Sequence, residues 1–293
     1  MIVSGIGRDA YKRPRTISAV SPFRYPGGKG FLAPFLAQHM AEIGVPMTVF
    51  AEPFAGGAGS ALRLLKDGLV ESLILNDLDI RVYSAWRAML RENERFQERL
   101  STIEPDLATW NACRETVERA SSEYSFELGF ATFFINRTSR AGIIVGSGPI
   151  GGYNQDGKWR LDARFYKDTM LKRIDWLGKN SSRIEITHRN ALEFLEWSVK
   201  HYSVNSTFYF IDPPYVAAGS RLYFNSMEEA DHRALASRLH SGDVKHWLLT
   251  YDRSDLVADL YENSDLYQLE VPYSLGTSRN EREFLVASNA IGI

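Results

Sequence analysis

The run Ile-Asp-Pro-Pro-Tyr at 211–215 combines a carboxylate, two prolines and an aromatic ring directly after the apolar stretch 207–211. Consecutive prolines hold an extended turn and carry no backbone N–H, so the carbonyl oxygens there meet few competing donors. The Asp212 carboxylate and the Pro213 carbonyl are therefore two acceptors that can take both N–H bonds of an amino group. Such acceptors turn a delocalised exocyclic amine toward tetrahedral geometry, and a fixed carboxylate stabilises the positive charge that develops on its nitrogen during alkylation.

Tyr215 adds an aromatic face on which a nucleobase can stack. A base inside a duplex cannot reach such a group, so the pattern predicts a base that is flipped out of the helix. The alternative interpretation is an ordinary turn at the end of a strand. The candidate catalytic residues are Asp212, Pro213, Pro214 and Tyr215.

A glycine-rich loop at 55–59 follows the apolar run 47–51. Glycines there let the backbone approach a cofactor closely. A dinucleotide-binding G-x-G-x-x-G pattern from Gly57 would need a glycine where the chain has Leu62, and this argues against NAD. The loop instead suits the amino-acid portion of S-adenosylmethionine. Asp77, which follows the next apolar run, can accept hydrogen bonds from ribose hydroxyls.

A second glycine-rich run, Tyr-Pro-Gly-Gly-Lys at 25–29, precedes this loop. Its lysine, Lys29, can meet the carboxylate of the cofactor as a positive charge. The alternative is a turn that carries a solvated lysine, and the spacing alone leaves both interpretations open.

The segment 136–160 is rich in glycine, serine and arginine, so it predicts irregular structure. Arginines among small polar residues suit phosphate and base contacts, and Tyr153 or Trp159 can fill the gap that a flipped base leaves. The alternative is a flexible solvated loop. The candidate DNA-binding residues are Asn136, Arg137, Thr138, Ser139, Arg140, Tyr153 and Lys158.

These motifs fall on alternating strands and helices. The order of strand, glycine loop, helix and acid-ended strand over 47–79 is the opening unit of a doubly wound α/β sheet. The almost continuous apolar run 207–211 is typical of a buried parallel strand. Further strands are predicted at 184–187 and 246–250, helices at 191–202, 231–239 and 254–261, and a closing hairpin at 266–271 and 283–287.

The pattern changes between residues 82 and 183, where helical spacing covers 82–100 and, in two pieces, 109–134. This stretch is predicted to be an insertion into the α/β domain. The predicted parts are an arm at 1–20, for which a merely solvated tail is the alternative, a catalytic domain at 21–84 and 184–293, and an inserted domain at 85–183.

The composition narrows the class of protein. The 293 residues carry a formal net charge of −2 and 44% are hydrophobic, which supports a sizeable core. No apolar run is long enough for a membrane span, no signal-peptide core is visible, and a single cysteine leaves no disulfide, so we expect a cytoplasmic protein. Near-neutral charge argues mildly against nucleic acid, although a local basic face suffices for binding. The six histidines lack metal-ligand spacing, so no metal is expected.

In combination, these residues resemble the Dam-like, D12-class DNA adenine N6-methyltransferases. The resemblance extends over nearly the whole chain after residue 20, and the order of its motifs is the α-type arrangement of that family. The motifs that carry it are those at 25–29, 52–59, 76–77, 134–138 and 212–215.

The resemblance implies a Rossmann-like, seven-stranded, S-adenosylmethionine-dependent methyltransferase domain with a mainly helical target-recognition insertion. It implies methyl transfer to a flipped adenine in double-stranded DNA. We expect a monomer, with a dimer as the alternative. Such enzymes often carry an acid after the strand 184–187, where this chain has Asn190, which alternatively caps the helix that begins at Ala191. The implied cofactor-binding residues are Tyr25, Lys29, Glu52, Pro53, Phe54, Gly56, Gly57, Gly59, Asp77, Asn190, Ala191 and Asp212.

Other functions share parts of this pattern. A methyltransferase that acts on RNA or on a glutamine amide uses the same Pro-Pro-Tyr chemistry, but the early lysine motif and the large insertion argue against both. Cytosine N4 methylation is disfavoured because Asp212 stands where a serine is expected. A DNA-binding regulator without catalysis is disfavoured because Asp212, Tyr215 and the glycine loop are intact. The sequence does not give the DNA sequence that is recognised. It also does not decide whether the protein acts in restriction-modification.

Overall fold

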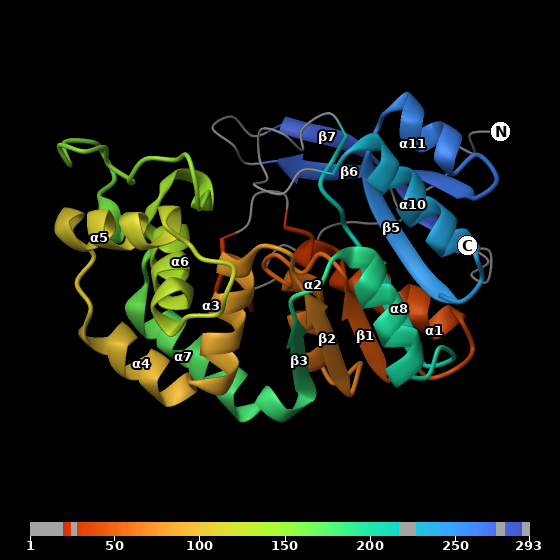
Figure 1. The fold of residues 1–293 in the computed structure, drawn as a ribbon, viewed down its shortest axis with the longest axis horizontal. Coiled ribbons are helices and arrows are strands. Elements are labelled where there is room, and N and C mark those ends of the chain that lie inside the picture. The colour runs from red at the N-terminus through yellow and green to blue at the C-terminus, as the bar shows by residue number, and fades with distance from the viewer. Residues whose placement is uncertain (1–19, 25–27, 217–226, 274–278, 289–293) are drawn as a thin grey trace.

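The computed structural model describes residues 20–24, 28–216, 227–273 and 279–288. The predicted arm, apart from residue 20, lies outside them, as does Tyr25. One mixed β-sheet forms the centre, with helices on both of its faces and further helices gathered beside it (Figure 1). The strand order in the sheet is β3-β2-β1-β4-β5-β7-β6.

The first five strands along the chain run parallel to one another. They are largely apolar because helices cover both faces of the sheet, and every residue of β4 is buried. The closing hairpin is confirmed, with β7 antiparallel to both β5 and β6. The strands are β1 (Val49–Glu52), β2 (Ser72–Asn76), β3 (Ile184–Thr187), β4 (Thr207–Ile211), β5 (His246–Asp252), β6 (Asp265–Tyr273) and β7 (Arg279–Ala287).

Side chains of the central strands alternate between two hydrophobic cores, as the pleat of a strand requires. In β1, Phe50 packs into the core on one face and Ala51 into the core on the other. Helices α1 and α2 contribute to the first core, and helices α8, α10 and α11 contribute to the second. These helices are α1 (Ala33–Glu42), α2 (Gly59–Lys66), α8 (Ala191–His201), α10 (Glu229–His240) and α11 (Asp255–Leu260), with a short helix η1 (Gly30–Leu32) before α1.

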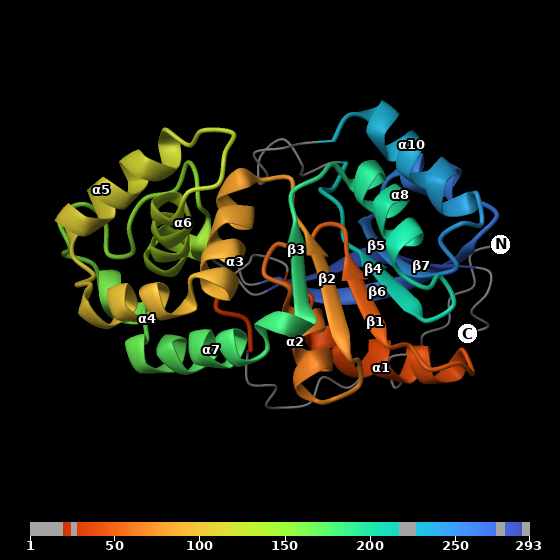
Figure 2. The same cartoon turned by 60° about the horizontal axis from the view of Figure 1, so that its bottom comes forward.

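The chain between β2 and β3 forms mostly helices, which lie beside the sheet beyond β3 (Figures 1 and 2). Helix α6 is buried along nearly all of its length. It packs closely on α3 at Gly129, where an added Cβ would lie 2.4 Å from the Ser84 carbonyl oxygen. The elements are α3 (Ile80–Arg91), α4 (Asn93–Thr102), α5 (Leu107–Glu118), α6 (Phe126–Thr138), η2 (Arg140–Gly142), η3 (Leu161–Arg164), α7 (Lys167–Lys179) and η4 (Ser181–Arg183).

The end of α6 corrects one prediction. Irregular structure was expected from Asn136, but the helix continues through Thr138. Polar side chains are tolerated there because they bond internally: the Thr138 hydroxyl donates to the Phe134 carbonyl, and the Asn136 amide donates to the Gly142 carbonyl. Within the described part of the chain, no helix is long and apolar enough to cross a membrane.

Candidate active site

Polar groups meet where the parallel strands end, at the edge of the sheet where open α/β folds bind ligands. Glu52 is the last residue of β1, Asn76 ends β2 and Asp212 follows β4. Thr250 lies near the end of β5. The structure therefore brings the glycine-loop strand and the Asp-Pro-Pro-Tyr strand together, because β1 pairs directly with β4.

Asp212 is held from two sides. The Thr250 hydroxyl donates to its Oδ1 over 2.6 Å, and Lys29 Nζ lies 3.2 Å from each of its carboxylate oxygens. A quarter of the Asp212 side chain remains exposed. The carboxylate thus has a fixed orientation and one open side, as an acceptor for a substrate amine requires.

Lys29 lies deep in the site, with 5% of the residue exposed. Its ammonium group donates to the Tyr215 hydroxyl over 2.7 Å and lies between two carboxylates, Asp212 and Glu283, the latter at 3.4 Å. Sequence reasoning placed Lys29 at the cofactor's carboxylate, whereas its observed partners belong to the Asp-Pro-Pro-Tyr motif and to β7. Burial of Glu283 raises its pKa and the nearby charge of Asp212 adds to the rise, whereas Lys29 opposes it.

Glu283 was absent from the predicted site. Its one sequence signal is an acid at the start of the predicted apolar strand 283–287, where only 2% of its side chain is exposed. Tyr215 was predicted to stack on the base, but 7% of it is exposed and its ring packs 6.5 Å from that of Tyr251. In this structure the hydroxyl of Tyr215 is therefore engaged with Lys29, and little of its ring is open to a stacking partner. Pro213 is buried and Pro214 is half-buried.

The glycine loop is tied to the end of β2 through Asp77. Its Oδ2 accepts the Gly56 N–H over 2.9 Å, and its Oδ1 accepts the Asp79 N–H over 2.9 Å. Burial raises the pKa of the Asp77 carboxyl to about 7, and the charge of Asp79 adds to this rise. Each oxygen of Asp77 keeps a lone pair that a ligand hydroxyl can use.

Backbone strain and a close approach mark the same loop. Ala58, which precedes α2, has a left-handed φ of 45°, a conformation that costs a non-glycine residue about 1 kcal/mol or more and clusters at functional sites. A Cβ on Gly59 would lie 3.1 Å from the Gly30 Cα, so the loop packs against the end of the lysine motif. The Ser60 hydroxyl reinforces this contact by donating to the Lys29 carbonyl over 2.6 Å.

Glu52 is buried and has an internal partner. Its Oε1 accepts the Ala61 N–H at the start of α2 over 3.2 Å. Burial raises the pKa of the Glu52 carboxyl to about 8, an effect that the hydrogen bond opposes and the charge of Asp212 increases. Pro53 and Gly57 are buried too, and Phe54 is half-buried beside them.

Asn76 connects the glycine loop to the end of β3. Its amide nitrogen donates to the carbonyls of Pro53 and Arg189, and its oxygen accepts the Arg189 N–H. The next residue, Asn190, caps α8, because its Oδ1 accepts the Glu193 N–H over 2.9 Å. The observed contact of the Asn190 oxygen is therefore that of a helix cap. Ala191, the first residue of that helix, is half-buried.

The candidate DNA-binding residues divide into two groups. Asn136, Arg137, Thr138 and Ser139 are at most 4% exposed, so their side chains do not face solvent. Asn136 instead bonds both the N–H and the carbonyl of Arg24 over 2.8 Å, and the Ser139 hydroxyl accepts the Trp110 indole N–H. They are buried because α6 packs against both α3 and α5 among the helices between β2 and β3.

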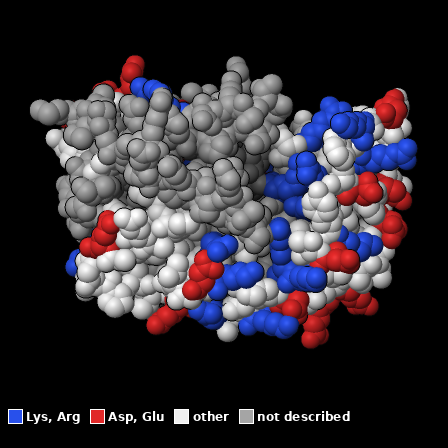
Figure 3. Space-filling view, turned by 180° about the vertical axis from the view of Figure 1, so that it is seen from behind, with Lys and Arg blue, Asp and Glu red and all other residues white. Residues whose placement is uncertain are grey.

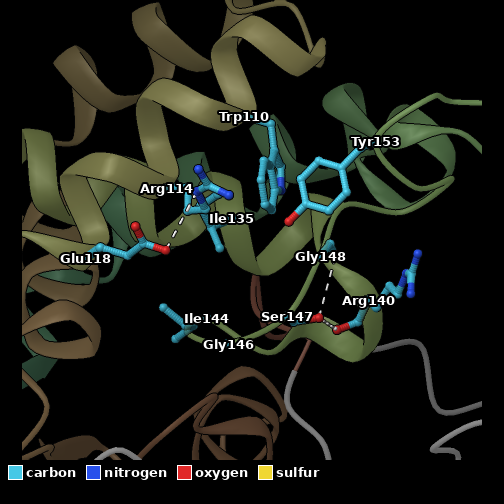
Figure 4. A pocket seen from close by; sticks show the side chains of 10 residues that line it. All are labelled: Trp110, Arg114, Glu118, Ile135, Arg140, Ile144, Gly146, Ser147, Gly148 and Tyr153. Atoms are coloured by element: carbon cyan, nitrogen blue, oxygen red, sulfur yellow. Dashed lines mark hydrogen bonds and ion pairs between the residues drawn. The ribbon is translucent and has the colours of Figure 1, made fainter.

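The second group is exposed and consists of Arg140, Tyr153 and Lys158. Arg140 and Tyr153 line a cavity of about 360 Å³ between α5, α6 and the loop that follows (Figure 4). In it the rings of Trp110 and Tyr153 lie edge to face, 5.8 Å apart, and Arg114 lies over Trp110. Trp110 and Arg114 were not predicted, since they look like ordinary helix residues in sequence.

Comparison with known proteins shows the family to which this chain belongs. The family model for D12 class N6 adenine-specific DNA methyltransferases matches residues 25–275. The chain belongs to this family. Among solved structures, this family member is similar to the rRNA methyltransferase aviRa from Streptomyces viridochromogenes, with 15% identity, a TM-score of 0.40 and coverage of 97% of this chain and 96% of that one. That likeness is too distant to bear on the substrate. No curated protein matches the chain.

Family membership confirms the resemblance that the motifs carried. This D12-class protein is an enzyme that methylates the N6 position of adenine in DNA, and the family implies S-adenosylmethionine as its methyl donor. The α/β methyltransferase fold is confirmed as well. By its description, this family acts on the N6 position of adenine in DNA, and not on cytosine N4, RNA or glutamine amides.

Proposed function

We propose that this enzyme methylates an adenine that is flipped out of double-stranded DNA, and that Asp212 and the Pro213 carbonyl hold its amino group. The observation that carries the proposal is the Asp212 carboxylate, which is fixed by Lys29 and Thr250 yet a quarter exposed. A fixed, partly open carboxylate beside a proline-held carbonyl fits a two-donor amine.

The residues around the glycine loop fit S-adenosylmethionine. The close approach of Gly59 to Gly30 leaves little room for a side chain at this point, which is typical of a backbone cradle. Asp77 offers free lone pairs at the end of β2, where an acid accepts ribose hydroxyls. The N-terminus of α2, directly after the loop, favours a carboxylate. We propose that the cofactor is held by Phe54, Gly56, Gly57, Gly59 and Asp77.

Two of the implied cofactor residues take supporting roles in this proposal. Glu52 orients the start of α2 through Ala61 rather than meeting the ligand, since 4% of it is exposed. Lys29 positions Asp212 and Tyr215 rather than the carboxylate of the cofactor. Both assignments follow from the observed partners.

The bound cofactor supplies an electrophilic methyl group on a sulfonium. The protein contributes geometry and charge. Asp212 and the Pro213 carbonyl accept the two N–H bonds, so the nitrogen lone pair leaves the ring plane. The same carboxylate stabilises the positive charge that forms on nitrogen, and it lies where the departing proton can be taken. Thr250 and Lys29 keep the carboxylate in place throughout.

The insertion at 85–183 is our candidate for the target-recognition domain. Its exposed residues Arg140, Tyr153 and Lys158 suit groove and phosphate contacts, and the cavity beside Trp110 offers an aromatic wall (Figure 4). On the face seen in Figure 3, Lys and Arg side chains lie among Asp and Glu side chains, and the net charge of the chain is close to zero. DNA binding needs only a local basic face, which a net charge close to zero allows.

The test replaces Asp212 and measures methyl transfer from labelled S-adenosylmethionine to unmethylated duplex DNA. Asp212→Asn and Asp212→Ala are expected to lower the rate by about 10²–10³ with the melting temperature nearly unchanged. The matched control is Asp259→Asn, an exposed acid on α11, which should behave as wild type. An Asp212→Ala enzyme that keeps more than about a tenth of the wild-type rate contradicts the assignment.

A further inference from the structure

Four arginines gather where the start of the described chain meets the insertion, and we call them the arginine cluster: Arg24, Arg137, Arg164 and Arg173. They come from four separate elements, the segment 20–24, α6, η3 and α7. Arg137 is the most buried, with 4% exposed, whereas Arg164 is exposed and the other two are half-buried. The cluster therefore extends from the interior to the surface.

Hydrogen bonds to backbone carbonyls hold the cluster together. Arg24 donates to the carbonyls of Arg137 and Ser139 over 3.4 and 3.1 Å. Arg137 donates to the carbonyl of Arg164, and Arg173 donates to the carbonyl of Ser21 over 2.5 Å. Carbonyls satisfy N–H groups, but they cancel no charge.

Among the described residues, no aspartate or glutamate forms an ion pair with any of the four. The Nε of Arg137 is buried and has no hydrogen-bond partner there. Burial, together with the charges of Arg24 and Arg173, lowers the pKa of Arg137 to about 9. Buried charges are normally paired, so this set of like charges with an unpartnered buried donor favours the binding of an anion.

We infer that the arginine cluster binds a phosphate of the DNA backbone. Planar guanidinium groups match the oxygens of a phosphate with paired N–H donors, which ammonium groups cannot do. The inference rests on the proposed function, which supplies a polyanion as substrate. It also fits the chain path, since Arg24 lies five residues before Lys29 of the catalytic group and bonds Asn136 of the insertion. A phosphate bound here would tie the insertion to the catalytic domain on DNA.

The variants are chosen so that the fold survives. Arg164→Gln keeps the carbonyl that Arg137 uses and removes an exposed guanidinium group that donates to the Tyr166 hydroxyl. Arg173→Gln keeps a donor for the Ser21 carbonyl. The double variant removes two charges from the cluster. Its matched control removes two charges elsewhere, Arg119→Gln with Arg233→Gln, at side chains that are 79% and 57% exposed.

The experiment measures the affinity for duplex DNA against salt concentration, without cofactor, in the full-length protein. Each phosphate contact contributes about 0.9 to the slope of log K against log salt. The double variant is expected to bind at least about tenfold more weakly to every sequence and to lose about one unit of slope relative to the control. Affinity for S-adenosylmethionine should stay as in wild type. Arg164→Gln alone should show part of the effect and carries the test if the double variant does not fold.

Two outcomes overturn the inference. A slope equal to that of the control, with only a lower melting temperature, shows that the arginines merely hold carbonyls. Inorganic phosphate that stabilises wild type but not the double variant, with an unchanged DNA slope, shows a site for the free anion instead. Failure of the proposed function is a separate result, since it appears as wild-type protein that does not methylate duplex DNA at all.

Discussion

Lys29 Nζ lies 2.7 Å from the Tyr215 hydroxyl, although 186 residues separate them in the chain. The same ammonium group lies between the carboxylates of Asp212 and Glu283. The first glycine-rich motif and the Asp-Pro-Pro-Tyr motif are thus parts of one site, with a buried acid from β7 as the third part. Variants that remove one charge or one hydrogen-bond donor from this group therefore test what it contributes to methyl transfer and to stability.

Removing the charge of Lys29 should damage both the fold and the reaction. Lys29→Met leaves Asp212 and Glu283 facing each other without a cation, which should destabilise the protein by about 3 kcal/mol, as for a broken buried pair. The double variant Lys29→Met with Glu283→Gln should recover most of the stability in thermal unfolding, since it removes the unpaired acid. Methyl transfer should remain low in both proteins, because Asp212 and Tyr215 stay unsupported. Full recovery of activity in the double variant would make Lys29 a structural residue only.

The hydroxyl of Thr250 should matter for the rate of methyl transfer. Thr250→Val keeps the shape but removes the donor that lies 2.6 Å from Asp212 Oδ1. A hydrogen bond to a charged group contributes about 1.5–3 kcal/mol, so the rate of methyl transfer should fall about 10- to 100-fold. Thr250→Ser, which keeps the donor, is the matched control. Equal rates for the valine and serine proteins would contradict this role.

Glu52 should make stability depend on pH. Burial raises its pKa to about 8 in the folded state, above the usual value of 4.5, so the folded protein holds this proton more tightly than the unfolded chain. The folded state is therefore favoured below about pH 4.5, and that stability is lost as the pH rises toward 8. Glu52→Gln keeps an acceptor for Ala61 but cannot ionise, so its advantage in melting temperature over wild type should grow between about pH 4.5 and pH 8 and stay level above that.

The control for this pH series is Glu98→Gln, an exposed acid on α4, whose melting temperature should follow that of wild type at every pH. A Glu52→Gln protein with the same pH dependence as wild type would show that the carboxyl is ionised in the folded state.

Asn190 should behave as a helix cap. Its oxygen accepts the Glu193 N–H, so Asn190→Leu should lower the stability by about 1 kcal/mol, whereas Asn190→Asp keeps the cap. We expect calorimetric titration with S-adenosylmethionine to give similar affinities for all three proteins. A specific loss of affinity in the leucine protein alone, beyond its loss of stability, would instead return Asn190 to the cofactor site.

Local sequence determined much of the catalytic domain. The apolar run 207–211 ended by Asp-Pro-Pro-Tyr, and the run 47–51 ended by a glycine loop, predicted two buried strands with ligand-binding ends, and both strands are present. These predictions succeed because strand burial, turn chemistry and glycine conformation depend on residues close in the chain. The family resemblance rested on the same local motifs and their order, and the family model confirms it.

Tertiary structure decided the partners of those motifs. Lys29 has no local signal for Asp212 and Glu283, since the three come from the start, the middle and the end of the chain. The segment 136–139 looked like a polar loop, yet it is the buried end of α6 with its C-cap Ser139, and Arg24 and Trp110 bond its polar groups. Burial and pairing depend on which elements pack together in three dimensions, and the spacing of residues within one segment carries no record of that.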